Sequence, residues 1–415
     1  MIKVDIVDIA SLVAYVNNAR KHPRKQIDQI ASSISQFGFT NPILIDAGKN
    51  VIAGHGRLLA ARQLGLQTVP TIMLGDLSPS QVKALRLADN KIALNAGWDV
   101  ELLSAEFLDL KTFDVDFDLS ATGFSIGEID VILSQSADPD DNAIPPVPLQ
   151  IVTQPGDIWE LGPHRIGCGD SRDLDWLRRV VGDRPADCAF LDPPYNVRIK
   201  GHANVKSQHR EFAMASGEMS VSQFRGFLLD TLGPCVSVSR DGAVHFVCMD
   251  WRHIDDLSAA ASQLYDAQLN LCIWNKSNAG MGSLYRSKHE LVFTYRVGLT
   301  PHLNAVELGR HGRNRTNVWD YPSVNTFRGS RRADLALHPT VKPTAMVVDA
   351  IQDVTRRGDI VLDAFLGSGT TLIAAERSGR VFRGVDIDPA YVDLAVARWS
   401  EMTGGKPVRI QGSIQ

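Results

Sequence analysis

The 415-residue sequence has few cysteines, no apolar run long enough to span a membrane and no signal-peptide pattern at its N-terminus. The five cysteines show no Cys-x-x-Cys spacing, which is typical of buried thiols in a reducing compartment; they are Cys168, Cys188, Cys235, Cys248 and Cys272. These absences argue against a membrane or secreted protein. We expect a cytoplasmic protein with no membrane partner and no bound metal.

The sequence also has no excess of basic residues. It contains 43 Lys and Arg against 47 Asp and Glu, and its net charge is −4. This balance argues mildly against a nucleic-acid partner, although binding requires a basic face and not a basic total. Hydrophobic residues make up 44% of the chain, which is ample for a core. The length predicts two or three domains.

Two stretches are locally basic. Residues 197–210 contain no acid, and residues 310–332 contain one acid, Asp320, with Trp319, Tyr321 and Phe327 among the arginines. Both are rich in Gly, Asn and Ser, so they are predicted to be loops, which often carry function. We interpret them as DNA-binding loops, with a merely solvated loop as the alternative. The predicted DNA-binding residues are Arg198, Lys200, Arg310, Arg313, Arg315, Arg328, Arg331 and Arg332.

The most informative motif is the tetrapeptide of Asp192, Pro193, Pro194 and Tyr195, which follows the apolar run 189–191. The run predicts a buried strand, and the prolines end it because they cannot donate to a sheet. A carboxylate, a free carbonyl and an aromatic ring are therefore expected at the carboxyl end of a strand, where open α/β sheets bind ligands. These groups match an exocyclic amino group and its flat ring; an ordinary surface turn is the alternative.

A second motif lies near the C-terminus. Residues 359–365 predict a buried strand, 366–371 a glycine-rich turn, 371–378 a helix ended by Gly379, and 381–386 the next strand. Strand, glycine turn, helix and strand form the unit that binds nucleotides, and Asp386 stands where an acid can hold ribose hydroxyls. The turn lacks both the three spaced glycines of the dinucleotide fingerprint and a P-loop lysine. These features favour a nucleoside without pyrophosphate, with S-adenosylmethionine as the first candidate.

With these two motifs the chain resembles the amino-group DNA methyltransferases over about residues 151–412. The tetrapeptide resembles their catalytic motif, and residues 363–371 resemble their cofactor motif. The catalytic motif comes first, as in the circularly permuted beta class. Four shorter stretches also resemble segments of these enzymes. Residues 169–171 resemble the acidic turn at the adenine of the cofactor, and residues 338–343 resemble the segment that closes over its methionine moiety. Residues 289–290 resemble a framework motif, and residues 317–320 resemble a segment that is usual in these enzymes.

This resemblance implies a Rossmann-like α/β fold with a mostly parallel sheet and a permuted motif order. It also implies that Asp192 and the carbonyl of Pro193 accept hydrogen bonds from the amino group of a flipped base, beside Pro194, while stacking on Tyr195 contributes about 1–3 kcal/mol. The implied cofactor is S-adenosylmethionine. Its implied binding residues are Asp170, Lys342, Asp363, Phe365, Gly367, Ser368, Gly369, Thr370, Thr371 and Asp386.

In the family that the chain resembles, Asp at the first motif position indicates adenine N6, whereas Ser more often marks cytosine N4. The chain has Asp192, which favours a site-specific adenine-N6 methyltransferase acting on double-stranded DNA. A cytosine-N4 enzyme, an RNA or protein methyltransferase and a non-catalytic DNA-binding factor stay open as alternatives. The architecture resembles modification enzymes of phages, mobile elements and restriction–modification systems.

The N-terminal third predicts a different module. Residues 24–37 place apolar side chains on one helical face, and Gly38 ends the helix. Paired strands at 42–46 and 51–53, a helix from Gly54 through Leu64 and a strand at 69–74 follow. Ser78 and Gln81 form a capping box that starts a helix through about Asn95, and Ser125 with Glu128 caps a short helix.

This region resembles the α+β ParB/sulfiredoxin-like domain over about residues 1–95. Gly54, His55, Gly56 and Arg57 stand at a helix start, which is a natural anion site, so a nucleotide or phosphate is a candidate partner. A structural turn or a DNA phosphate contact is the alternative. No cysteine precedes Cys168, which excludes redox chemistry there, and His55–Gly56 replaces the Glu-Arg of ParB nucleotidases.

We therefore expect a ParB-like domain with a helical extension over 1–135 and an acidic, Pro-rich linker over 136–150. A methyltransferase domain is expected over 151–415, with target-recognition loops near 196–215 and 305–335. The sequence leaves a homodimer open.

Overall fold

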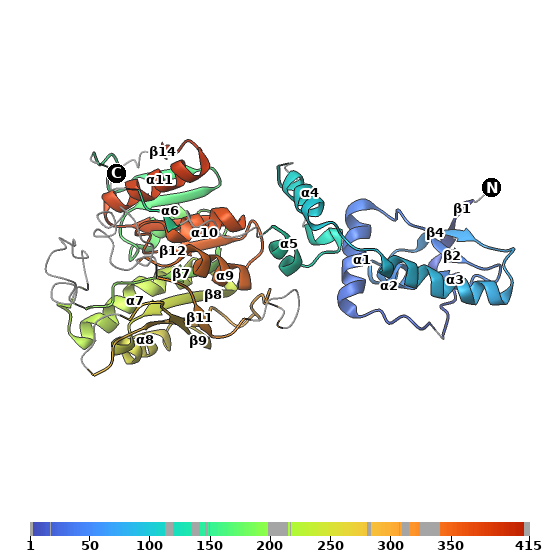
Figure 1. Cartoon of the computed structure of the whole chain (residues 1–415), viewed down its shortest axis with the longest axis horizontal. Coiled ribbons are helices and arrows are strands. Elements are labelled where there is room, and N and C mark those ends of the chain that lie inside the picture. Colours follow the sequence, from blue (N-terminus) through green and yellow to red (C-terminus); the bar gives the residue numbers. More distant parts are fainter. Residues whose placement is uncertain are drawn as a thin grey trace. The chain divides into compact units, whose positions relative to one another are not determined.

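The computed structural model describes residues 3–16, 18–112, 119–133, 142–145, 148, 150–197, 215, 217–279, 284–306, 308, 315–323 and 341–410. The chain divides into two compact units, Met1–Gln135 and Ser136–Gln415 (Figure 1). In these described ranges no helix is both long and apolar enough to cross a membrane.

The N-terminal unit is built on a four-stranded sheet, as far as the described residues go, with the order β1-β4-β2-β3. Its strands are β1 (Val4–Asp8), β2 (Ile43–Ile45), β3 (Val51–Ala53) and β4 (Thr68–Met73). Its helices are α1 (Arg24–Phe37), α2 (His55–Gln63), α3 (Pro79–Ile92), α4 (Val100–Thr112) and α5 (Ile126–Leu133). The strands β2 and β3 pair antiparallel, as the sequence predicts.

Local chemistry sets the boundaries of these helices. The capping box predicted at Ser78 and Gln81 is formed on both sides and starts α3 at Pro79. Gly38 ends α1 with φ of 79°, a backbone conformation that glycine adopts without strain. The predicted helices are confirmed, although α3 ends at Ile92 and continues as a short 3-10 turn, Ala93–Asn95.

The C-terminal unit is built on a mixed sheet that contains ten described strands in the order β11-β9-β10-β8-β7-β12-β13-β6-β5-β14. The strands are β5 (Ile158–Leu161), β6 (His164–Cys168), β7 (Ala186–Leu191), β8 (Ser239–Met249), β9 (Ala267–Asn275), β10 (His289–Arg296), β11 (Val318–Asp320), β12 (Ile360–Asp363), β13 (Val381–Asp386) and β14 (Val408–Ile410). The centre, from β8 to β6, is parallel. Antiparallel pairs stand on both flanks.

Helices cover both faces of this sheet (Figure 1). One face packs on α6 (Leu174–Val181), α7 (Val221–Ser237) and α8 (Ile254–Ala261) through one core cluster. The other packs on α9 (Thr344–Val354), α10 (Thr370–Ser378) and α11 (Pro389–Thr403) through two more. The strand β7 contributes Ala189 to the first face and Cys188 to the second, so it is buried on both sides as the sequence predicts.

The strand order reverses between β7 and β12. From β7 the parallel sheet continues to β8 on one side, and from β12 it continues to β13 on the other. Open α/β sheets bind ligands at such a reversal, outside the carboxyl ends of the strands. Asp192 directly follows β7 and Asp363 ends β12, so the fold brings the two sequence motifs to one place.

Candidate active site

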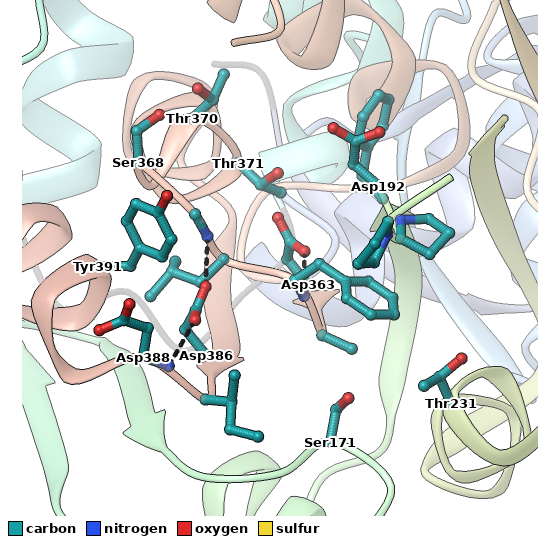
Figure 2. Close-up of a pocket in the computed structure, with 18 of the residues that line it drawn as sticks. Ser171, Asp192, Thr231, Asp363, Ser368, Thr370, Thr371, Asp386, Asp388 and Tyr391 are labelled. Carbon is teal, nitrogen blue, oxygen red and sulfur yellow. Dashed lines mark hydrogen bonds between the residues drawn. The ribbon is translucent and has the colours of Figure 1, made fainter. Parts of the chain in front are cut away.

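A cleft of about 190 Å³ lies at the carboxyl ends of β7, β12 and β13 (Figure 2). Many of its lining residues are predicted from the sequence to serve separately in catalysis or in cofactor binding. These are Asp170, Asp192, Pro193, Pro194, Tyr195, Lys342, Asp363, Phe365, Gly367, Ser368, Thr370, Thr371 and Asp386. Catalytic and cofactor motifs more than 150 residues apart therefore line a single cleft.

The turn between β12 and α10 forms one wall of the cleft. Gly367 and Gly369 have φ of 51° and 77°, so both need glycine. A Cβ on Gly369 would lie 2.9 Å from the Cβ of Ala395, so α11 approaches the turn too closely for a side chain. Because α10 begins at Thr370, free backbone N–H groups of its first turn stand at the cleft, where they suit an anionic group such as a carboxylate.

Two carboxyls, the buried Asp363 and the half-buried Asp386, hold this wall in place through backbone N–H groups. Asp386 Oδ2 accepts from the amide of Gly367 at 2.9 Å, and its Oδ1 accepts from the amide of Asp388 at 2.9 Å (Figure 2). Asp363 Oδ1 accepts from the amide of Phe365 at 2.9 Å. Burial raises the pKa of Asp386 to about 6 and that of Asp363 to about 7.

The cleft is acidic. Five aspartates line it, and Lys342 is the one cationic side chain among its described lining residues. One aspartate, Asp170, is already paired with Arg172 Nη2 at 2.6 Å. Burial disfavours the ionised form of a carboxyl, whereas a nearby positive charge stabilises it. A cationic ligand would therefore interact favourably with these carboxyls. The lining residues therefore fit a nucleoside that carries a sulfonium and an ammonium group.

The catalytic motif forms the opposite wall. Asp192 Oδ2 accepts from Lys342 Nζ at 2.6 Å, and Oδ1 accepts from the hydroxyl of Tyr195. Lys342 precedes α9, and its side chain is 5% exposed. The cofactor role of Lys342 implied by the resemblance stays a prediction; in this arrangement its ammonium lies on Asp192.

Glu290 and Lys276 extend this contact inward. Glu290, on β10, lies 3.1 Å from Lys342 Nζ through Oε2 and accepts from Lys276 Nζ at 2.5 Å through Oε1. Burial opposes ionisation of Glu290, but the two lysines overcome it and lower its pKa. Burial alone would lower the pKa of Lys342, yet Asp192 and Glu290 raise it. In the sequence, Glu290 stands out only as part of a framework motif, and Lys276 carries no signal.

Some lining residues lie outside the segments that the sequence predicts. They include Thr231, Ile387, Asp388 and Tyr391, and three of these four are labelled in Figure 2. Three of the four follow the strand end at Asp386 within five residues, so their position along the chain was a usable signal. Thr231 lies on α7 and carried none.

Most predicted DNA-binding residues lie outside the described residues: Arg198, Lys200, Arg310, Arg313, Arg328, Arg331 and Arg332. Arg315 is described. Its Nη1 donates to Asp349 at 2.8 Å and its Nε donates to Asp353 at 3.0 Å, both on α9. These ion pairs within the domain compensate its charge, and we leave Arg315 out of the proposed DNA-binding face.

The predicted anion site of the N-terminal unit stands at the start of α2. Gly54 is the residue before the helix, with φ of 98°. The side chains of this segment have internal partners: Arg57 donates to the carbonyl of Asn41 at 2.8 Å, and His55 Nε2 accepts from the amide of Tyr15 at 3.3 Å. Burial lowers the pKa of both His55 and Arg57. These contacts favour the structural-turn interpretation, and the anion site stays a prediction.

Three family models match the chain. The DNA methylase model of the N6/N4 family matches residues 186–397, just over half of the chain. The ParB N-terminal domain model matches residues 2–91, and the ParB-methyltransferase HTH domain model matches residues 101–155. The last match includes both the predicted helical extension and the predicted linker.

Relatives match each unit separately. The ParB-like nuclease domain-containing protein YnaK of Escherichia coli (strain K12) is 44% identical over 80 residues, 19% of this chain and 92% of YnaK. The type II methyltransferase M.HpaI of Haemophilus parainfluenzae is 25% identical over 233 residues, 52% of this chain and 69% of M.HpaI. The structure of TTHA0409, a putative DNA modification methylase of Thermus thermophilus complexed with S-adenosyl-L-methionine, aligns over 61% of this chain and 99% of its own, with 20% identity and a TM-score of 0.43.

The fold and the cleft define a Rossmann-like, nucleoside-binding enzyme class. Within it, the chain belongs to the N6/N4 family of DNA methylases, with an N-terminal ParB-like domain. It is an S-adenosylmethionine-dependent DNA methyltransferase that modifies an amino group, which confirms the predicted family, fold class and cofactor.

Proposed function

We propose that the protein is a site-specific DNA methyltransferase that methylates the N6 amine of an adenine flipped out of double-stranded DNA. The observation that carries the proposal is the shared cleft. Asp192 and Pro193 stand at the end of β7, and Asp363 and the glycine turn stand at the end of the neighbouring β12. An amino group bound at the first strand end would thus lie beside a cofactor bound at the second.

The acceptors in the cleft suit the chemistry of an amine. The amino nitrogen has two N–H groups, which Asp192 and the Pro193 carbonyl would accept, so its lone pair is directed away from them. S-adenosylmethionine supplies the electrophilic methyl group. As the nitrogen gains positive charge, the preplaced carboxylate stabilises it electrostatically, and close positioning supplies much of the rest of the rate. The ring of Tyr195 would stack on the flipped base.

The cofactor would lie against the glycine turn. Asp386 would accept from ribose hydroxyls, Asp170 would lie at the adenine, and the start of α10 would receive the carboxylate of the methionine moiety. Asp363 would face the positive end of the cofactor. The wider set that we propose to bind it includes Phe365, Gly367, Ser368, Thr370 and Thr371, which line the cleft, and Gly369 of the same turn, as the resemblance implied. The resemblance also implied Lys342, whose ammonium lies on Asp192 in this structure.

Adenine is favoured over cytosine by Asp192, because Asp at this position indicates adenine N6 in the family that the chain resembles. Site specificity is supported by the match to M.HpaI, which is named a type II methyltransferase. The two basic stretches, without Arg315, would contact the DNA backbone. The ParB-like unit would add a second DNA contact or hold a nucleotide or phosphate, and we propose that the protein works in the cytoplasm.

Nucleoside mass spectrometry tests the proposal. Unmethylated DNA is incubated with S-adenosylmethionine and either the wild type or the Asp192→Ala variant, and the digested nucleosides are measured. N6-methyladenine that forms with the wild type alone supports the proposal. Formation of N4-methylcytosine would mean that the target base is cytosine and not adenine. Methylation that persists in the Asp192→Ala variant would overturn the proposed role of Asp192.

A further inference from the structure

The ammonium of Lys342 lies within reach of three oxygens. Nζ is 2.6 Å from Asp192 Oδ2, 3.1 Å from Glu290 Oε2 and 3.3 Å from the hydroxyl of Tyr195. An ammonium has three N–H donors, so these oxygens match its capacity. Lys342 is thus shared between one carboxylate at the cleft and one behind it.

The charges around this ammonium are balanced and partly buried. Two carboxylates, Asp192 and Glu290, face two ammonium groups, Lys342 and Lys276. The side chains of Lys342 and Glu290 are 5% and 10% exposed. Removing one partner of a buried ion pair leaves a charge uncompensated, which is costly. Lys342 can therefore leave one carboxylate only for another.

The proposed chemistry is hindered while Lys342 stays on Asp192. Each oxygen of Asp192 already has one donor, Oδ2 from Lys342 and Oδ1 from the hydroxyl of Tyr195. A carboxylate oxygen has a second lone pair, but the ammonium at 2.6 Å crowds Oδ2 and offsets the negative charge that would stabilise the incoming amine. Glu290 Oε2 is buried and already lies 3.1 Å from Lys342 Nζ, farther than the 2.6 Å that separates this nitrogen from Asp192 Oδ2. An acceptor for the displaced ammonium is therefore already in place.

We propose that Glu290 is a positioning residue that takes the Lys342 ammonium from Asp192 when the base enters, and that Lys342 guards Asp192 until then. The inference rests on the proposed role of Asp192 as the acceptor of the amino group. Lys276 neutralises the other oxygen of Glu290 and keeps it a carboxylate throughout. Sequence separation hid the arrangement, because the four residues come from four segments between Asp192 and Lys342.

Three variants test this exchange: Glu290→Gln, Lys342→Met and the two combined. In Glu290→Gln, Asp192 is the one carboxylate left within reach of Lys342 among the described residues, so the ammonium stays on it. We expect KM for DNA to rise about tenfold, because the base must displace a better-held cation. The affinity for S-adenosylmethionine should change less than about twofold.

The combined variant is the decisive one. With no ammonium to displace, we expect KM for DNA to return to within about threefold of the wild type, so the second change rescues the first. The control is Glu160→Gln, which removes a carboxylate from the Arg165 ion pair on β5 and β6, away from the cleft. It should leave KM unchanged. DNA affinity by fluorescence anisotropy and thermal unfolding are measured in parallel.

The failures are distinguishable. The combined variant could have a KM at least as high as that of Glu290→Gln and also a lower unfolding temperature. That result would mean that the four residues are merely structural, and it would overturn the inference. A Glu290→Gln variant that matches Glu160→Gln would overturn it too, even if Lys342→Met fails to fold. A wild type that methylates no DNA base would instead reject the proposed function, and the inference with it.

Discussion

The two walls of the cleft hold their carboxyls by different means. On the wall formed by β12 and β13, Asp363 and Asp386 accept from backbone amides of the turns beside them, and Asp363 also accepts from the side chain of Thr371. On the wall formed by β7, Asp192 accepts from two side chains, those of Tyr195 and Lys342. Backbone amides cannot leave their places without a change of fold, whereas side chains can change rotamer. The first wall, named the cofactor wall after its proposed role, is therefore largely preorganised, and the second, the catalytic wall, can exchange partners.

This difference explains the division of charge in the cleft. Asp363 and Asp386 accept from backbone amides and have raised pKa values, so a bound cation would stabilise their ionised forms. Asp192 already has an ammonium partner, which can be exchanged for the amino group of the base. Four predictions test the contrast between the walls.

The largest effect is expected from Asp192→Ala on the catalytic wall. The methyl-transfer rate should fall by about a hundred- to a thousandfold, because an electrostatic acceptor of the transition state is lost. Affinity for S-adenosylmethionine, measured by calorimetry, should stay close to the wild type. A variant that loses cofactor binding as well would show that the two walls are not independent.

On the cofactor wall, Asp386→Ala should weaken S-adenosylmethionine binding by about tenfold to a hundredfold, because it removes the ribose acceptor and the anchor of Gly367. Asp386→Asn keeps one acceptor for that amide, and we expect a smaller loss. Equilibrium binding measures both. Unchanged affinity in the alanine variant would contradict the proposed ribose contact.

Tyr195→Ala should raise KM for DNA by about tenfold, since base stacking is worth about 1–3 kcal/mol. Tyr195→Phe is the matched variant, because it keeps the ring and removes only the hydroxyl that donates to Asp192. Its KM should change less. Equal losses in the two variants would mean that the hydroxyl, and not the ring, is the part that matters.

The smallest effect is expected from pH. The pKa of Asp363 is raised to about 7, so this carboxyl is protonated below pH 7 and charged above it. A cation binds the charged form, so affinity for S-adenosylmethionine should fall about fivefold from pH 8 to pH 6 and level off above pH 8. S-adenosylhomocysteine, whose sulfur is neutral, should depend less on pH. An equal dependence would contradict a sulfonium contact.

Local sequence signals predicted much of the fold. The capping box at Ser78, the glycine at position 38 and the prolines after β7 act over a few residues, so their effects could be read directly. The same holds for the glycine turn before α10, whose helix begins at Thr370, one residue before its predicted start. Each of these features is decided by backbone geometry close in the chain.

Partners distant in the chain could not be predicted. The charge of Arg315 suggested a DNA contact, but the carboxylates of α9 that neutralise it lie more than 30 residues away. The resemblance of residues 338–343 to a cofactor segment predicts a cofactor role for Lys342, but nothing near it in the sequence pointed to its ion pair with Asp192. A sequence shows which side chains are charged, but it does not show which opposite charge each of them pairs with in the folded protein.

The sequence by itself determined the chemical groups of the site and the strand ends that carry them, because a motif fixes residue type and local backbone together. The tertiary structure alone decided how those groups are held. It placed Glu290 near Asp192 by pairing β10 with β8, which lies next to β7, and it brought Lys342, which precedes α9, into contact with both. A buried ion needs a counter-ion close by, and that counter-ion can come from any part of the chain. The order of the strands decides which charged residues lie next to each other, and this order cannot be read from the sequence.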